Sequence, residues 1–488
     1  MNQRRSRQRE HIQAPVPRVR VGRNELLWAL FVTLTFGCGA EDGGGAYDEL
    51  GDAPASAEPI AHMGGAGGAG GAGGAGGAGG APFGESGGEA GGAPPPPGEA
   101  EFAGDSGDMS GSPSPEPGGG AAPEPAPRPR AGQLTAGSWD DNAHANHYHR
   151  YAEEERDESI SDLPTARHLI TIRDAAGAPL RGATVTIHAE QQTTTLRTVD
   201  DGRVLYAPEL DGEAERYRIE VSYQGTSHSA ELSAEDPQVE LTLEGVTAAP
   251  VRRLELAFVL DVTGSMSDEL SYLQSELESI VTATRAIDPQ LELQLALVAY
   301  RDEGDEFVTR SVDFTGDVQA FKAALNALSA DGGGDYPEAM GEAMEASTSL
   351  SWSAAEDASR ILFLVADAPP HADRPSRTDR AAEQARAKGI RVYPIASSGV
   401  AGKAEWAMRQ LAAFTLGRYL FLTDDSGIGD SHAEPHIPCY HVELLQELMI
   451  RVIESALLGE WVPSASGERI RSVGFDEQGN CVGAEQTL

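Results

Sequence analysis

The sequence predicts an α/β fold with a doubly wound, mostly parallel sheet, preceded by a long disordered linker and a small antiparallel β-sandwich. From residue 252 onward, nearly continuous apolar runs alternate with amphipathic stretches. This pattern is typical of a parallel sheet covered by helices on both faces. Residues 168–246 instead alternate apolar and polar side chains, as half-buried strands do. Glycine and proline, 57 and 30 of 488 residues, are concentrated in the region before residue 132.

Charge and cysteine content exclude several classes of protein. The chain carries 76 acidic residues against 37 basic ones, a net charge of −39. A surface of this kind is not attracted to a phosphate backbone, so we expect no nucleic-acid partner. The 3 cysteines are too few for a four-cysteine zinc site or a disulfide-dense scaffold.

Residues 1–38 are predicted to be a signal peptide. Basic residues precede an apolar run over 26–36, which is shorter than the roughly 20 residues that span a bilayer as a helix. The run ends at Gly37-Cys38 and resembles a bacterial lipoprotein signal, in which the cysteine is lipidated after cleavage. Leu34 and Phe36 depart from the usual spacing and residue size of that signal. We expect an exported lipoprotein of the outer membrane or cell surface, held by a lipid anchor on Cys38; plain secretion and an uncleaved anchor are the alternatives.

Residues 39–132 are predicted to be a disordered linker. Residues 64–81 are six Gly-Gly-Ala repeats, and the segment holds too little apolar surface to offset the entropy cost of ordering. Its expected role is a flexible spacer between membrane and folded domains. Residues 133–164 are interpreted as a transition segment, in which three closely spaced histidines have no recognisable metal-ligand spacing and are expected to be solvated.

Residues 165–248 are predicted to form the small β-sandwich. Alternating strands are expected at 169–173, 183–188, 217–223 and 239–243, with glycine-containing turns between them. Short strands at this spacing favour an antiparallel sandwich. Their order resembles carboxypeptidase-regulatory-like modules, and this resemblance implies no catalytic residue.

Residues 252–460 are predicted to be the α/β domain, followed by a C-terminal tail over 461–488. Strands are expected at 254–260, 293–300, 361–365, 392–396 and 419–422, and helices at 268–286, 317–329, 337–348, 378–388, 403–414 and 441–457. Sheets of this class bind their ligands beyond the carboxyl ends of the strands.

Oxygen-bearing side chains follow two of these strands. The first strand runs into Asp261-Val-Thr263-Gly-Ser265, which places one carboxylate and two hydroxyls on a single turn. The fourth strand runs into Asp367, and a glycine-rich loop over 331–338 lies between them in sequence. Hard oxygen ligands of this kind suit Mg²⁺ or Mn²⁺.

This constellation resembles a von Willebrand factor type A domain with its metal-ion-dependent adhesion site. The resemblance implies that Asp261, Thr263 and Ser265 form the first metal-binding motif and that Asp367 is the third. Asp335 stands where the family usually supplies a threonine, as in a bacterial-rich subgroup of the family. If Asp335 also binds, three carboxylates leave the occupied site at −1, and an acidic partner gains less from it. Asp335 as the cap of the following helix is the alternative.

Other polar residues are interpreted as structural. Asp302 and Asp305 after the second strand are interpreted as turn residues, and His371 as a loop histidine. Cys439 and Cys481 form an even pair, predicted to be a disulfide in an exported protein, with two free thiols as the alternative.

The sequence lacks the motifs of several enzyme classes. It contains no phosphate-binding Gly-x-x-x-x-Gly-Lys-Ser/Thr loop and no His-Glu-x-x-His, and the predicted α/β domain over 252–460 contains no Gly-x-Ser-x-Gly. We therefore expect a metal-dependent protein-binding or adhesion module that is not an enzyme, with an unidentified protein as its ligand. A structural protein of the cell envelope, whose metal only stabilises the fold, and a hydrolase are the alternatives.

Overall fold

A computed structural model of the chain describes residues 129–334, 336–372 and 376–482. The predicted signal peptide over 1–38, the candidate lipidation site Cys38 and all but the last residues of the predicted linker lie outside the described residues. Within the part that is described, no helix is both long and apolar enough to cross a membrane.

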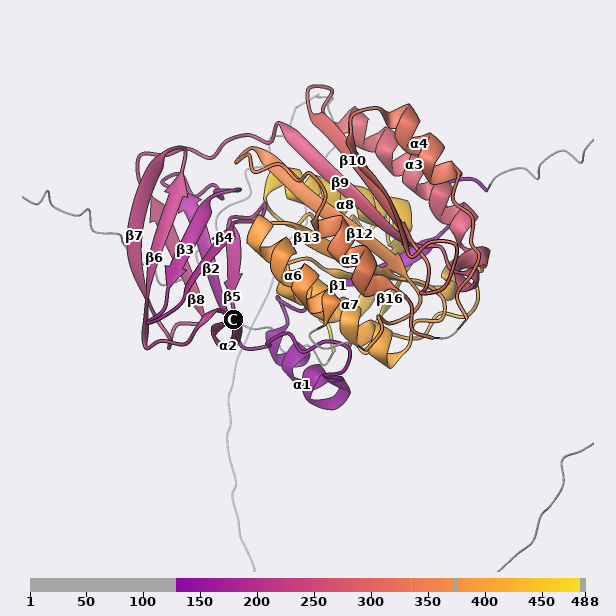
Figure 1. The fold of residues 1–488 in the computed structure, drawn as a ribbon, viewed down its shortest axis with the longest axis horizontal. Coiled ribbons are helices and arrows are strands. Elements are labelled where there is room, and N and C mark those ends of the chain that lie inside the picture. The colour runs from indigo at the N-terminus through magenta and orange to yellow at the C-terminus, as the bar shows by residue number, and fades with distance from the viewer. Residues whose placement is uncertain (1–128, 335, 373–375, 483–488) are drawn as a thin grey trace, which may run out of the picture. The chain divides into compact units, whose positions relative to one another are not determined.

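A nine-stranded sheet forms the centre of the α/β region (Figure 1). Its strand order is β11-β10-β9-β12-β13-β14-β1-β15-β16. The five neighbouring strands β10, β9, β12, β13 and β14 run parallel to one another. The remaining strand pairs are antiparallel. The strands are β1 Thr135–Trp139, β9 Arg253–Asp261, β10 Glu292–Tyr300, β11 Thr309–Thr315, β12 Ala358–Ala366, β13 Arg391–Ala396, β14 Tyr419–Leu422, β15 Tyr440–Leu444 and β16 Arg471–Val473. The expected α/β class with parallel central strands is therefore confirmed, and antiparallel strands extend the sheet at both sides.

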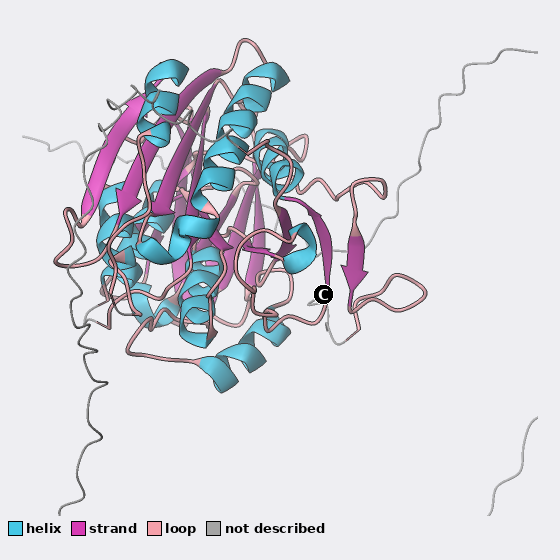
Figure 2. Ribbon diagram, turned by 90° about the vertical axis from the view of Figure 1, so that its right-hand side faces the viewer, coloured by secondary structure: helices cyan, strands magenta, loops and turns pink. Residues whose placement is uncertain are grey.

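Helices cover both faces of this sheet (Figure 2). Alternate residues of β9 point to opposite faces, so Phe258 packs in one apolar core and Val259 in the other. The first face is covered by α3 Leu270–Ile287, α4 Val318–Asn326 and α8 Leu445–Leu458, and the second by α5 Met340–Thr348, α6 Arg377–Lys388 and α7 Gly402–Phe414. Burial on both faces explains why the five parallel strands β10, β9, β12, β13 and β14 are largely apolar.

The transition segment expected over 133–164 is instead part of the α/β region. Strand β1 lies between β14 and β15, and helix α1, Ala145–Glu155, packs on α7. The backbone of Gly137 approaches the ring of Phe421 so closely that a Cβ at Gly137 would lie 2.5 Å from it. Because β1 is short and small residues precede its single Trp139, it lacks the apolar run that marks the parallel strands. Trp139 is buried, whereas of the three histidines expected to be solvated His149 is exposed and His144 and His147 are half-buried.

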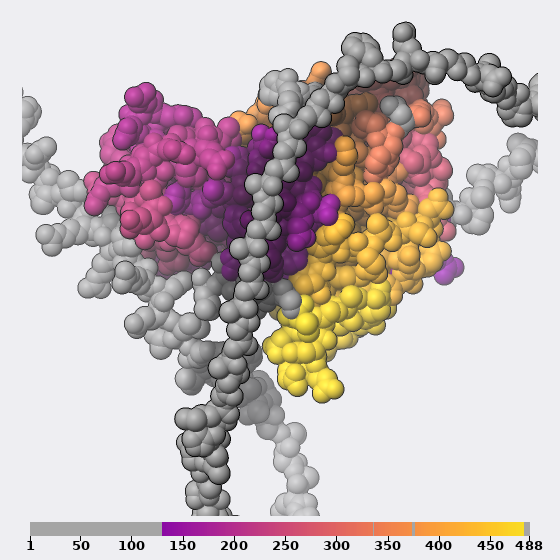
Figure 3. All heavy atoms as spheres, turned by 90° about the horizontal axis from the view of Figure 1, so that it is seen from below, coloured from indigo at the N-terminus to yellow at the C-terminus, as the bar shows by residue number. Residues whose placement is uncertain are grey.

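The expected C-terminal tail over 461–488 is also joined to the sheet. Strand β16 pairs with β15, and a disulfide links Cys439, just before β15, to Cys481. Figure 3 shows the yellow C-terminal residues packed against the orange residues of the α/β region on the face it displays. The helix expected from residue 441 begins at Leu445, since β15 occupies the preceding residues.

Residues 168–243 form two sheets that enclose one apolar core. One sheet has the order β5-β2-β8 and the other β4-β3-β6-β7. The strands are β2 His168–Asp174, β3 Thr184–His188, β4 Thr193–Arg197, β5 Arg203–Tyr206, β6 Arg216–Tyr223, β7 Thr226–Ser233 and β8 Gln238–Leu243, with a short helix, α2 Pro208–Asp211. The expectation of a purely antiparallel arrangement was wrong, because β8 runs parallel to β2. The chain reaches β8 from β7 in the opposite sheet, and such a crossing can deliver a strand in either direction.

Candidate metal centre

Two aspartates lie at the carboxyl ends of neighbouring parallel strands. Asp261 is the last residue of β9, and Asp367 directly follows β12. The two strands are paired up to Leu260 and Val365, so both carboxylates leave the sheet at the same edge. Asp261 is fully buried and Asp367 is 4% exposed. The sheet topology therefore brings these two predicted ligands to one place.

The turn after Asp261 organises its hydroxyl groups. The backbone N–H and the hydroxyl of Thr263 donate to Asp261 Oδ1, at 2.9 and 2.6 Å. The hydroxyls of Thr263 and Ser265 lie 3.1 Å apart. The carboxylate and the two hydroxyls of the predicted first motif thus form a connected set, in which Asp261 Oδ2 is buried and has no hydrogen-bond partner.

The glycine-rich loop is fixed by an aspartate that follows the second strand. Asp305 Oδ2 accepts from the backbone N–H groups of Gly333 at 2.9 Å and Asp302 at 3.0 Å. Both hydrogen bonds favour the ionised form and lower the pKa of Asp305. Gly332 has φ +81°, and a Cβ there would lie 2.4 Å from the Asp305 carboxylate. Glycine is therefore required at this position.

The same loop approaches the first motif, because Gly264 N–H donates to Gly332 O at 3.1 Å. Asp335 lies outside the described residues. His371 Nε2 lies 2.6 Å from Asp302 Oδ1, so this histidine pairs with the turn that carries Asp305. Burial opposes charging of His371, but the hydrogen bond to Asp302 outweighs it and raises the pKa of the histidine. Asp302, Asp305 and His371 thus support the loop.

Glu338 is a carboxylate at this edge that the sequence analysis did not assign. It is 4% exposed, and its Oε2 atom is buried without a hydrogen-bond partner. A Cβ on Gly333 would lie 2.9 Å from Glu338 Oε1 and 3.3 Å from Thr263 Cβ, so the glutamate reaches toward the first motif. Burial and then the neighbouring charge of Asp261 raise the pKa of Glu338 to about 9. The signal was present in the sequence, since Glu338 ends the glycine-rich motif.

Negative charge accumulates in this small volume. Burial, followed by repulsion from Asp367, raises the pKa of Asp261. Burial also raises the pKa of Asp367, and hydrogen bonding to the Ser265 hydroxyl works against that rise. A buried carboxylate needs a hydrogen bond or a cation to offset its lost hydration. Each of the carboxylates of Asp261, Asp367 and Glu338 has one buried oxygen without a partner.

The donor set fits a hard divalent cation. It consists of carboxylate and hydroxyl oxygens, the ligands that Mg²⁺ and Mn²⁺ prefer. In the ranges that the structure covers, no three His, Cys, Asp or Glu side chains are grouped closely enough to hold a metal by themselves. The predicted set differs from such a group, because two of its described members, Thr263 and Ser265, are hydroxyls.

A cleft of about 590 Å³ opens at this edge. Ser265, Gly333, Glu338 and Asp367 line it, so the candidate ligands face a space that a partner could enter. Tyr336 also lines the cleft and is 49% exposed. Its hydroxyl donates to Gly399 O at 3.3 Å, which holds an aromatic ring at the rim.

Comparison with known proteins supports the fold assignment. Residues 255–428 match the family model described as von Willebrand factor A domain. An ariadne-like RING finger protein of Acanthamoeba polyphaga mimivirus is 34% identical over 131 residues, which are 27% of this chain and 12% of that protein. The alpha-protein kinase vwkA of Dictyostelium discoideum is 24% identical over 142 residues, 29% of this chain and 22% of the kinase. The chain thus spans less than a quarter of the length of either relative.

Two solved structures are similar to part of the chain. BatB of Bacteroides thetaiotaomicron is 16% identical, with a TM-score of 0.30 and coverage of 42% of this chain and 98% of BatB. The pilus adhesin SpaC of Lactobacillus rhamnosus GG is 12% identical, with a TM-score of 0.29 and coverage of 44% of this chain and 31% of SpaC. Residues 255–428 thus match the model of a von Willebrand factor A domain, and their alternating strands and helices agree with the predicted α/β class.

Proposed function

We propose that the chain is a metal-dependent protein-binding or adhesion module. Asp261, Thr263, Ser265 and Asp367 would hold Mg²⁺ or Mn²⁺, with Asp335 as a further candidate ligand from the sequence. The observation that carries this proposal is the set of buried carboxylate oxygens without partners, at one sheet edge and beside an open cleft. The bound cation would supply a Lewis-acidic position that accepts an oxygen of a partner protein.

The charge of the site determines which partner groups suit it. Asp261 and Asp367 neutralise a divalent cation when both are ionised. Glu338 adds a third carboxylate, and Asp335 adds a fourth if it also binds. An acidic partner group then gains little from the cation, whereas a neutral carbonyl or hydroxyl oxygen meets no such repulsion.

Export and anchoring are part of the same proposal. The basic segment, the short apolar run and Cys38 favour a lipoprotein signal, and the Gly/Ala/Pro-rich segment would lift the folded region away from a membrane. The Cys439–Cys481 disulfide suits an oxidising compartment. Mass spectrometry of the mature N-terminus tests the anchor: a lipid-modified Cys38 supports it, and an unmodified residue other than Cys38 contradicts it.

The proposed module is not an enzyme. Ser265 is the exposed serine at the centre, and a hydroxyl that binds a metal is not available as a free nucleophile. A structural envelope protein with a purely stabilising metal, or a hydrolase, would use the same residues differently. Pull-down from envelope extract with and without chelator distinguishes the proposed binding module from a structural envelope protein. Only a metal-dependent binding module loses its partner when the chelator removes the metal. Hydrolase screening of the purified protein tests the second.

Isothermal titration tests the metal site directly. Mg²⁺ and Mn²⁺ are titrated into the wild type, into Asp261→Ala and into Asp236→Ala, a matched control at an exposed aspartate near β8. We expect saturable heat for the wild type and the control, and at least a tenfold loss of affinity for Asp261→Ala, because one buried ligand is removed. Equal titration curves for the two variants would refute the site.

A further inference from the structure

A second cleft, of about 580 Å³, lies where β1, β15 and the C-terminal residues meet. We call it the C-terminal cleft. Ser138 and Trp139 of β1, Tyr440 and His441 of β15, and Asn480 and Cys481 are among its lining residues. Its volume is in the range of sites that hold small molecules. It shares no lining residue with the cleft of the candidate metal centre.

The C-terminal cleft has the opposite charge balance to the chain as a whole. Arg418, Arg451 and Arg469 line it, and Glu443 is its only lining carboxylate among the described residues. The chain overall has 76 acidic and 37 basic residues. The pKa of His441, which also lines the cleft, is lowered by burial and then by the positive charges of Arg469 and Arg451. Both observations indicate a positive potential in this cleft.

Two of the arginines are held in place by neighbours. Arg418 pairs with Asp140 at 2.9 Å, and its guanidinium lies 4.0 Å from the centre of the Trp461 ring. Arg451 pairs with Glu443 and lies 5.4 Å from the same ring. The Nε atoms of both arginines are buried without a hydrogen-bond partner. Each arginine is therefore charge-balanced but retains an unused donor.

Arg469 differs from these two arginines. Its Nε and Nη2 atoms donate to the side chain and carbonyl of Ser464, each at 2.9 Å. Across the ranges that the structure describes, it forms no salt bridge, and it is exposed. Arg469 is therefore the uncompensated positive charge of the cleft. A guanidinium matches the planar geometry of carboxylate and phosphate groups.

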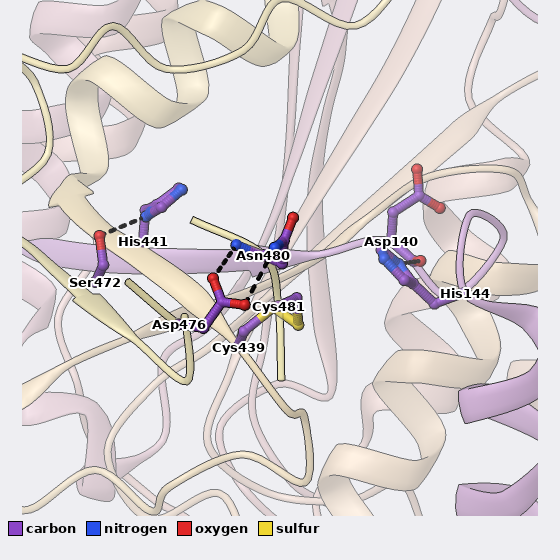
Figure 4. The surroundings of a disulfide bond; sticks show 8 residues. All are labelled: Asp140, His144, Cys439, His441, Ser472, Asp476, Asn480 and Cys481. Atoms are coloured by element: carbon purple, nitrogen blue, oxygen red, sulfur yellow. Dashed lines mark hydrogen bonds between the residues drawn. A yellow bond between two sulfur atoms is a disulfide. The ribbon is translucent and has the colours of Figure 1, made fainter. Parts of the chain in front are cut away.

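The rim of the cleft is cross-linked. Figure 4 shows the disulfide between Cys439 and Cys481 beside the turn that holds Asp476 and Asn480. Asp476 accepts from the backbone and the side chain of Asn480, at 2.7 and 3.1 Å. His441 stacks on Phe475 with ring centres 4.4 Å apart. Since the rim is fixed before a ligand arrives, binding requires little ordering of the chain.

We propose that the C-terminal cleft binds a small organic anion whose carboxylate or phosphate group pairs with Arg469. The cleft's aromatic side chains would contact the apolar part of the ligand. Arg418 and Arg451 would provide further donors and positive potential. This inference does not depend on the metal centre, since the two clefts have no lining residue in common.

Calorimetry with small probes tests the inference. Phenylacetate, phenyl phosphate and uncharged benzyl alcohol are titrated into the full chain carrying Asp261→Ala, so that the candidate metal centre is disabled. We expect saturable binding of at least one anion and none of the alcohol, with affinity falling as salt is added. A response to phenylacetate alone identifies a carboxylate ligand, and a response to phenyl phosphate alone identifies a phosphate ligand.

Variants assign the binding to this cleft. Arg469→Gln should weaken the anion about tenfold, because one charge-assisted hydrogen bond is lost. Arg310→Gln, at an exposed arginine of β11, is the matched control and should bind as the parent does. A Cys439→Ser, Cys481→Ser double variant should also bind more weakly. Equal affinity of Arg469→Gln and its parent, or no saturable binding of either anion, would overturn the inference.

Discussion

Glu338 shows how one carboxylate couples metal binding to pH. It is buried beside Gly333, and its pKa is raised to about 9. At neutral pH it is therefore mainly protonated, and a nearby cation must displace that proton to use the carboxylate. We expect Mg²⁺ affinity to rise between about pH 6 and 9 and Glu338→Gln to flatten this rise, because glutamine cannot ionise. Titration calorimetry at several pH values measures how Mg²⁺ affinity changes with pH in the wild type and in the variant. The same change in both proteins would show that ionisation of Glu338 does not contribute to metal binding.

The same residue predicts the stability of the metal-free protein. A carboxyl whose pKa is raised on folding binds more protons in the folded state than in the unfolded one. Its contribution to stability is therefore lost as pH rises from its unfolded pKa of about 4.3 toward 9. Without metal, Glu338→Gln should melt about 1–3 °C above the wild type near pH 9, where the wild type buries this charge. Thermal melts in chelator check this; a lower melting temperature for the variant at that pH would contradict it.

The carboxylates of the candidate metal centre differ in how far their positions could be predicted from the sequence. Asp261 and Asp367 follow apolar strands, and parallel strands bring their carboxyl ends to one edge, so their meeting could be predicted. Glu338 could not be placed in this way, because its position depends on the path of the glycine loop. That path is set by Asp305, which binds Gly333 from a turn after another strand.

At the scale of elements, a histidine fixes the loop that follows β14. His432 lies with one ring nitrogen 2.8 Å from Glu269 and the other 2.8 Å from Asp424. Its side chain is 4% exposed. The same loop carries Asp430, whose backbone N–H donates to Asp268 at 2.6 Å and which lines the cleft of the metal centre. His432 thus connects this loop to the residue that precedes α3.

Replacing His432 should destabilise the protein most at low pH. Burial opposes its charge, but the hydrogen bonds to Glu269 and Asp424 outweigh burial and raise its pKa. Its contribution is full below the unfolded pKa of about 6.5 and is lost as pH rises through the higher folded value. His432→Gln should cost about 1–3 kcal/mol near pH 6 and less near pH 9.

Denaturant unfolding at the two pH values measures this difference. Asn146→Gln, at an exposed residue of α1 that does not titrate, is the control and should change little at either pH. A cost for His432→Gln that is independent of pH would show that the histidine stabilises the loop without being charged.

The disulfide joins the last elements of the chain to the sheet. Cys439 and Cys481 are separated by 42 positions, and the closed segment contains β15, α8 and β16. Cross-linking a loop of this length lowers the entropy of the unfolded chain. Replacing both cysteines by serine should therefore reduce the free energy of unfolding by about 3–4 kcal/mol. Denaturant titration of oxidised wild type, reduced wild type and the double variant measures it; equal stability of all three would contradict the prediction.

Strand β1 shows why some elements could not be predicted from local pattern. Strands β9, β10, β12, β13 and β14 are largely apolar and buried, and sequence alone identified them, whereas the partly exposed strand β11 was not predicted. In β1, Thr135–Trp139, small and polar residues predominate. β1 occupies its position in the sheet because it pairs with β14 and β15, which lie far away in sequence. The local sequence of β1 carries no signal for these long-range pairings.

At the scale of the whole molecule, the α/β region depends on residues far before it in sequence. Two buried arginines of its helices find their carboxylate partners there. Arg386 of α6 binds Asp211 at 2.6 and 2.8 Å, and Arg409 of α7 binds Asp141 at 2.7 and 3.0 Å. A buried charge that loses its partner costs about 3–5 kcal/mol. The family match over 255–428 therefore does not mark the limits of a unit that folds alone.

This dependence predicts how fragments behave. A fragment over 252–460 lacks β1, so β14 and β15 both gain an unpaired edge, and it also lacks Asp211, Asp141 and β16. Unpaired apolar strands aggregate. We expect this fragment to be insoluble or to unfold without a cooperative transition, whereas a fragment over 130–482 remains soluble and melts as the full chain does. Solubility on expression and thermal melts by circular dichroism compare the two. A soluble 252–460 fragment with the melting temperature of the longer one would show that β1 and the two ion pairs are dispensable for the fold.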